Sequence, residues 1–131
     1  IVWFSLDNPG QSPRVPVFCG VKDFPALFDI CGNHRYRDDA ALWHYREANK
    51  LAAVKWGTFR KTMEKNIIYF EEKGQRELPF VEAQYQQILK EKGEDAARDF
   101  LTGYTSDFFG ATIMRWDEMA RDYWIQSRFG L

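Results

Sequence analysis

The sequence lacks the features that define several common classes of protein. Its 131 residues contain no uninterrupted apolar run near the length of about 18 that a membrane helix requires, so we expect no membrane partner. Eighteen Lys and Arg residues oppose nineteen Asp and Glu residues. This balance argues against nucleic acid as a partner, because nucleic-acid binders carry a basic surface. No internal repeat or low-complexity linker divides the chain, whose length fits a single domain.

Cysteine is scarce. Cys19 and Cys31 are too few for a disulfide framework, and they do not indicate a cellular compartment. Together with His34 and His44 they are four candidate zinc ligands, but only Cys31 and His34 have the close spacing of a zinc-binding pair. We therefore expect no metal and no other cofactor, and we interpret both cysteines as buried structural residues.

Aromatic residues are abundant, at 17% of the chain, and many of them follow helical spacing. Apolar side chains recur every three or four positions between residues 38 and 74, which predicts one long amphipathic helix. Asp38 or Asp39 is its expected N-cap, and Gly74 is its expected C-terminal stop. The stripe consists of Leu42, Tyr45, Asn49, Ala52, Trp56, Phe59, Met63, Ile67 and Phe70.

Two further helices are predicted behind the first. Pro79 suits the first turn of a helix that runs to about Lys92. Another helical pattern begins near Asp95 and reaches about Gln126, either without interruption or with a new start at Ser106. The acidic pairs Asp38-Asp39, Glu71-Glu72 and Glu94-Asp95 are interpreted as capping and solvated residues, because neighbours on a helix point in different directions.

The N-terminal residues predict a β-hairpin. β-Branched and aromatic residues dominate positions 1–7, turn residues follow, and a second strand is expected over 14–21. Pro16 cannot donate a ladder hydrogen bond, so this strand should lie at an edge or carry a bulge. A two-stranded hairpin is marginal alone, so we expect it to belong to a larger sheet. The predicted fold class is α+β and predominantly helical, with a hairpin at 1–21 and a helical region at 38–127.

The hairpin carries the most specific pattern in the chain. It comprises Val2-Trp3-Phe4-Ser5-Leu6-Asp7, then Pro9 and Ser12, then Val15-Pro16-Val17-Phe18-Cys19-Gly20-Val21, followed by Asp23 and Pro25, with Ala41-Leu42-Trp43 opening the long helix. This pattern resembles the C-terminal part of the bacterial PepD-type dipeptidases, cysteine peptidases of the N-terminal-nucleophile hydrolase superfamily.

The resemblance implies a four-layer αββα sandwich and a nucleophile that is a cysteine exposed at the mature N-terminus. Ile1, Cys19 and Cys31 do not match that residue, so no catalytic residue is assigned within this chain. We expect residues 1–131 to be a single C-terminal fragment that is inactive alone. Its parent protein is expected to hydrolyse short peptides, and Arg14 and Arg35 are candidates to bind a substrate carboxylate.

Two other functions stay open at this stage. A non-catalytic helical interaction module would use the stripe between residues 42 and 70 to meet a partner helix. A thiol enzyme would use Cys31 with His34 as its base. The dipeptidase interpretation instead makes the missing N-terminal part of the same protein the main partner. An exposed hairpin edge also allows pairing of two copies into a homo-oligomer.

Overall fold

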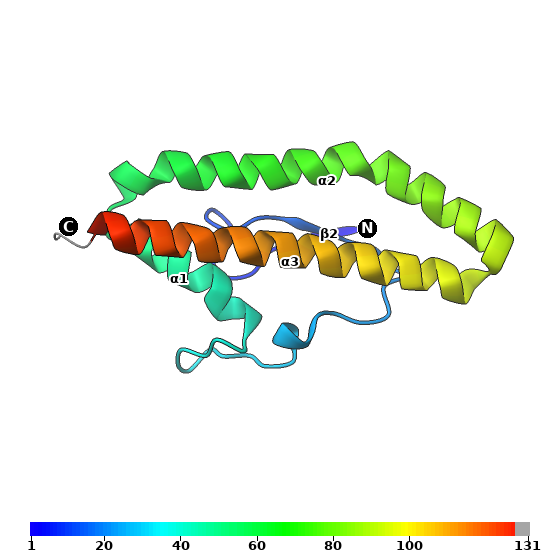
Figure 1. Ribbon diagram of the computed structural model, residues 1–131, viewed down its shortest axis with the longest axis horizontal. Helices are drawn as coiled ribbons and strands as arrows, with labels where there is room; N and C mark the ends of the chain where they lie inside the picture. The colour runs from blue at the N-terminus through cyan, green and yellow to red at the C-terminus, as the bar shows by residue number, and fades with distance from the viewer. Residues whose placement is uncertain (128–131) are drawn as a thin grey trace.

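The computed structural model describes residues 1–127, which form a short β-hairpin, one 3-10 turn and three α-helices (Figure 1). The predicted fold class, α+β and predominantly helical, is confirmed. The elements in chain order are β1 (Val2–Phe4), β2 (Val15–Val17), η1 (Ala26–Phe28), α1 (Ala41–Val54), α2 (Trp56–Lys92) and α3 (Glu94–Ser127).

The three helices enclose the core. Figure 1 shows α2 and α3 running in opposite directions, with α1 lying beside the C-terminal part of α3. Most of the predicted stripe between residues 42 and 70 is buried, and α3 supplies the opposing surface. The rings of Phe59 and Tyr123 lie 4.3 Å apart between α2 and α3. The largest buried side chains are Trp116, Tyr45, Tyr123, Phe59, Phe108, Phe109, Met63 and Met119.

The prediction of one helix from residue 38 to residue 74 is wrong at both ends and in the middle. The helix is divided at Lys55, whose φ of −136° and ψ of 58° are not helical. The apolar spacing nevertheless continues across this turn, because α1 and α2 both cover α3. The predicted caps are also wrong: Ala40 is the N-cap, and the Asp39 carboxylate is bound by Arg37.

Gly74 and Pro79 lie inside α2 rather than between two helices. A side-chain β-carbon at Gly74 would lie 2.8 Å from Cζ3 of Trp3, so the glycine allows the indole of β1 to approach the helix closely. Figure 1 shows that α2 is not straight and curves towards α3 near its C-terminal end. Pro79 is inside this helix, and proline is a usual cause of such bending. The third predicted helix is continuous through Ser106.

The hairpin is shorter than predicted but pairs as expected. β1 and β2 are antiparallel, with Trp3 opposite Pro16, and Pro16 lies in an edge strand as its missing N–H predicts. The two strands are buried unequally. Val15 of β2 is 1% exposed among the helices, whereas Val2 and Phe4 of β1 are 62% and 41% exposed.

A polar network fixes the hairpin to the helices. Asp7, which has a φ of 65°, accepts hydrogen bonds from Arg46 Nε at 2.8 Å and Asn49 Nδ2 at 3.0 Å. Asn49 also donates to Ser12 Oγ, and its Oδ1 accepts from the indole of Trp116 at 3.2 Å. Asn49 therefore interrupts the apolar stripe because it is the buried hub that joins the hairpin to α1 and α3.

Candidate functional site

The two arginines proposed to bind substrate lie on different segments of the chain. Arg14 precedes β2, and its Nη1 lies 2.6 Å from Oε1 of Glu71 on α2, so its charge is compensated within the chain. Arg35 lies exposed in the segment between η1 and α1. Their use in binding a substrate carboxylate stays a prediction.

Both cysteines are exposed, which corrects the interpretation of Cys19 and Cys31 as buried structural residues. Cys19 lies beyond the end of β2, because the strand stops at Val17. Cys31 lies in the segment before α1, and the nearby His34 is also exposed. Within residues 1–127, no three His, Cys, Asp or Glu side chains are grouped so as to hold a metal ion.

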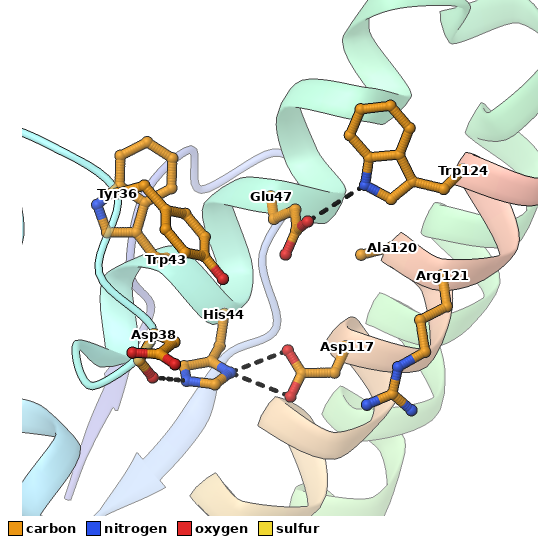
Figure 2. Close-up of a pocket in the computed structure, with 9 residues that line it drawn as sticks. All are labelled: Tyr36, Asp38, Trp43, His44, Glu47, Asp117, Ala120, Arg121 and Trp124. Carbon is orange, nitrogen blue, oxygen red and sulfur yellow. Dashed lines mark hydrogen bonds and ion pairs between the residues drawn. The ribbon is translucent and has the colours of Figure 1, made fainter. Parts of the chain in front are cut away.

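A pocket of about 270 Å³ lies where α1, the segment before it and the C-terminal part of α3 meet (Figure 2). Three carboxylates, three aromatic rings and two basic side chains line it. The lining residues are Tyr36, Asp38, Trp43, His44, Glu47, Asp117, Ala120, Arg121 and Trp124. This concentration of polar and aromatic groups makes it the candidate functional site.

His44 bridges two sides of the pocket. Its Nδ1 lies 2.9 Å and 3.0 Å from the two carboxylate oxygens of Asp117, and its Nε2 lies 2.6 Å from the main-chain oxygen of Asp38. Both ring nitrogens thus face acceptors, and a ring that carries both protons donates to each. The arrangement fixes Asp117 in place and leaves neither nitrogen of His44 directed at open space.

The aromatic walls are held by hydrogen bonds from their indoles. Trp43 Nε1 donates to the main-chain oxygen of Gly32 at 2.6 Å, and Tyr36 meets the Trp43 ring edge to face at 5.3 Å. Trp124 Nε1 donates to Oε1 of Glu47 at 3.2 Å across the pocket. Tyr36 and Trp124 remain 58% and 57% exposed.

The pocket has a negative electrostatic character. Burial raises the pKa of Tyr36, and the charges of Glu47, Asp38 and Asp117 raise it further. Arg121 is the basic lining residue that does not take part in the His44 bridge. The arrangement can bind a positively charged group between aromatic faces, and it contains no activated nucleophile among the residues that line it.

Sequence reasoning identified His44 but missed the other polar residues of this pocket. Asp117 lies 73 positions from His44, so no local spacing joins them. Asp117, Arg121 and Trp124 follow helical spacing along one face of α3, as Trp43 and Glu47 do on α1. The sequence shows a short polar and aromatic face on each of the two helices. Only the packing of α1 against α3 brings these two faces together.

Comparisons with known protein families, curated proteins and solved structures found no match to this chain. The resemblance to the PepD-type dipeptidases is therefore a prediction that these comparisons leave untested. Among the helices of residues 1–127, none combines the length and apolar character needed to cross a membrane.

Proposed function

We propose that this chain is the C-terminal structural portion of a dipeptidase that uses an N-terminal cysteine nucleophile located upstream. The proposal rests on the hairpin sequence that resembles the PepD-type enzymes. The observation that carries it in the structure is the open β1 edge. In this role the chain completes a sheet and covers it with helices, and it supplies no catalytic residue.

The hairpin has the surroundings that this role requires. On one face, Trp3 packs against Gly74 of α2, and on the other, Phe4 meets Phe109 of α3 with ring centroids 6.3 Å apart. The β2 side is buried, but Ile1 and Val2 on the β1 side are 48% and 62% exposed. A strand with unpaired backbone groups and exposed apolar side chains is a ready site for another strand.

Much of the stripe proposed as the contact surface of an interaction module is covered within the chain. Tyr45, Phe59, Met63 and Phe70 of the stripe are at most 4% exposed, because α3 of the same chain covers them. A partner helix would have to bind elsewhere on the molecule.

Labelling of the active thiol tests the proposal on the native polypeptide that contains these residues. We expect it to hydrolyse unmodified dipeptides, and we expect iodoacetamide to abolish the activity by modifying one cysteine. Peptide mapping should place that modification on an N-terminal cysteine. The double variant Cys19→Ser/Cys31→Ser should keep its activity and its sensitivity to iodoacetamide.

Two results would overturn the proposal. One is a folded native polypeptide that does not hydrolyse dipeptides. The other is loss of hydrolysis in the single variant Cys31→Ser with retention in Cys19→Ser, which would support the Cys31 and His34 thiol enzyme instead.

A further inference from the structure

We propose that the pocket between α1 and α3 binds a small organic cation, with an alkylated ammonium group held between the rings of Tyr36 and Trp124 and neutralised by Glu47. This inference does not rest on the proposed function, because none of the residues that line the pocket belongs to the hairpin.

Glu47 supplies the negative charge that the cation would neutralise. Both carboxylate oxygens of Asp117 lie within hydrogen-bond distance of His44 Nδ1, so the charge of Asp117 is already partnered within the chain. The partner of Glu47 among the described residues is the neutral indole N–H of Trp124. Figure 2 shows Glu47 between the side chains of Tyr36 and Trp124. Its charge is therefore available to a cationic ligand.

The aromatic rings suit a cation better than an anion, because the face of an aromatic ring is negative. The chain already uses this interaction beside the pocket, where Cζ of Arg46 lies 5.4 Å from the centroid of the Trp43 ring. Because Arg46 covers one face of Trp43, the exposed rings of Tyr36 and Trp124 are the surfaces left for a ligand.

The size and the balance of charges narrow the class of ligand. Pockets for drug-sized ligands have volumes of about 300–1,000 Å³, so a pocket of about 270 Å³ suits a single head group. Three carboxylates outnumber Arg121 and His44 in the lining, which disfavours a phosphate or a free carboxylate. An alkylated ammonium also needs no hydrogen-bond donor or acceptor around its carbon atoms, so the aromatic walls satisfy it.

Choline is the probe for the test, and its neutral carbon isostere, a dimethylbutanol, is the matched control for shape. The indole N–H resonances of the ¹⁵N-labelled protein report on Trp124 directly. We expect choline to shift the Trp124 resonance saturably, and we expect the isostere to cause no saturable shift because it has the same outline without the charge.

Variants then separate charge from aromatic contact. Glu47→Gln keeps an acceptor for the Trp124 indole, and it should weaken choline binding by about fivefold or more. Asp122→Asn removes an exposed charge from α3 outside the pocket and should change binding by less than about twofold. Trp124→Leu should weaken binding to a similar extent as Glu47→Gln, whereas Phe80→Leu, at an exposed aromatic residue on α2, should not.

The proposal is overturned by any one of three results with the folded protein. The first is the absence of a saturable shift of the Trp124 resonance with choline. The second is binding of the isostere as tight as that of choline. The third is binding of choline to Glu47→Gln as tight as to Asp122→Asn. Matching far-ultraviolet circular dichroism spectra of the variants exclude unfolding as the cause of a loss.

Discussion

The N-terminal segment of residues 1–40 and the helical region of residues 41–127 are held in place by different interactions. The helices bury aromatic and aliphatic side chains from all three elements in one core. The segment has only two three-residue strands and a short 3-10 turn of its own. It is fixed by hydrogen bonds to Asn49 and Arg46, and by rings packed around Phe109. The helices are specified by apolar residues that recur at helical spacing, whereas a few long-range contacts position the hairpin.

Because of this difference, the position of the segment should depend on a few residues whose substitution has a large effect. Phe24 and Phe28 lie with their ring centroids 6.0 Å and 4.6 Å from that of Phe109, and Phe4 approaches the same ring. The buried polar hub at Asn49 joins three parts of the chain. Loss of one such contact should loosen the whole segment, whereas the helices share their packing among many side chains.

The largest effect is expected at the hub. Asn49→Ala removes a side chain that is 2% exposed, and with it one hydrogen bond each to Asp7, Ser12 and the Trp116 indole. Asp7 keeps Arg46 and the indole keeps the main-chain oxygen of Gln11 as partners, whereas the buried Ser12 hydroxyl loses its Asn49 partner. We expect the free energy of unfolding to fall by about 3 kcal/mol, because unsatisfied buried groups cost about 1–3 kcal/mol each. Urea denaturation measures the change. Asn33→Ala, at an exposed asparagine of the segment, is the control and should change stability by less than about 0.5 kcal/mol.

The next effect is a reversal of ordinary helix propensity. Alanine normally stabilises a helix by about 1 kcal/mol over glycine, but Gly74→Ala places a β-carbon 2.8 Å from the Trp3 ring. We expect a net loss of about 2 kcal/mol. Gly103→Ala on α3 is the matched control, because nothing lies within 4 Å of its added β-carbon. Thermal unfolding should show the control to be stabilised, and equal stabilisation of both variants would contradict the close Trp3 contact.

A smaller effect is expected from acid. Burial tends to raise the pKa of Asp7, but hydrogen bonds from Asn49 and Arg46 outweigh it, so the folded-state pKa lies below the ordinary value of 3.8. A lowered folded-state pKa stabilises the fold above the unfolded-state pKa, and this contribution is lost as the pH falls through the folded-state pKa. Asp7→Asn should therefore flatten the dependence of the unfolding free energy on pH below about pH 5.

Glu77 provides the corresponding test within the helices. Burial tends to raise its pKa, but hydrogen bonds from Tyr104 and Lys73 lower it overall. Glu77→Gln should flatten the same acid limb without releasing the hairpin. The Trp3 indole resonance distinguishes the two variants. Its chemical shift should change on acidification, and only Asp7→Asn should alter the pH at which this change occurs.

The smallest effect is expected at the exposed ion pair of Arg14 and Glu71. The side chains are 50% and 34% exposed, and exposed pairs contribute about 0–1 kcal/mol. Arg14→Gln should thus lower the unfolding free energy by less than about 0.5 kcal/mol in urea denaturation. A loss as large as that of Asn49→Ala would show that the hairpin depends on surface charge and not on the buried network.

Apolar periodicity predicted the helical content well, because Tyr45, Phe59, Met63 and Phe70 face one core. It did not predict the turn at Lys55, since both neighbouring helices use the same face of the pattern. Gly74 was interpreted as the end of one helix and Pro79 as the start of the next. The contact with Trp3, which is more than seventy positions away, and the bend of α2 explain them instead, and neither is visible in local sequence.

The candidate pocket was less predictable than the fold. His44 was considered as a zinc ligand, but its partners are Asp117 and the main chain of Asp38. Glu47 and Trp124 are ordinary surface residues on their own helices, and only the packing of α1 on α3 brings them within hydrogen-bond distance. Such a site depends on a helix crossing, which residue types and spacing do not determine.

The N-terminal residue and intact mass of the native polypeptide, isolated from its source, test the central claim most directly. The account predicts a polypeptide larger than these 131 residues, with cysteine at its mature N-terminus and Ile1 inside the chain. A native polypeptide that begins at Ile1 and has no associated upstream chain would contradict it, because no N-terminal nucleophile would then exist.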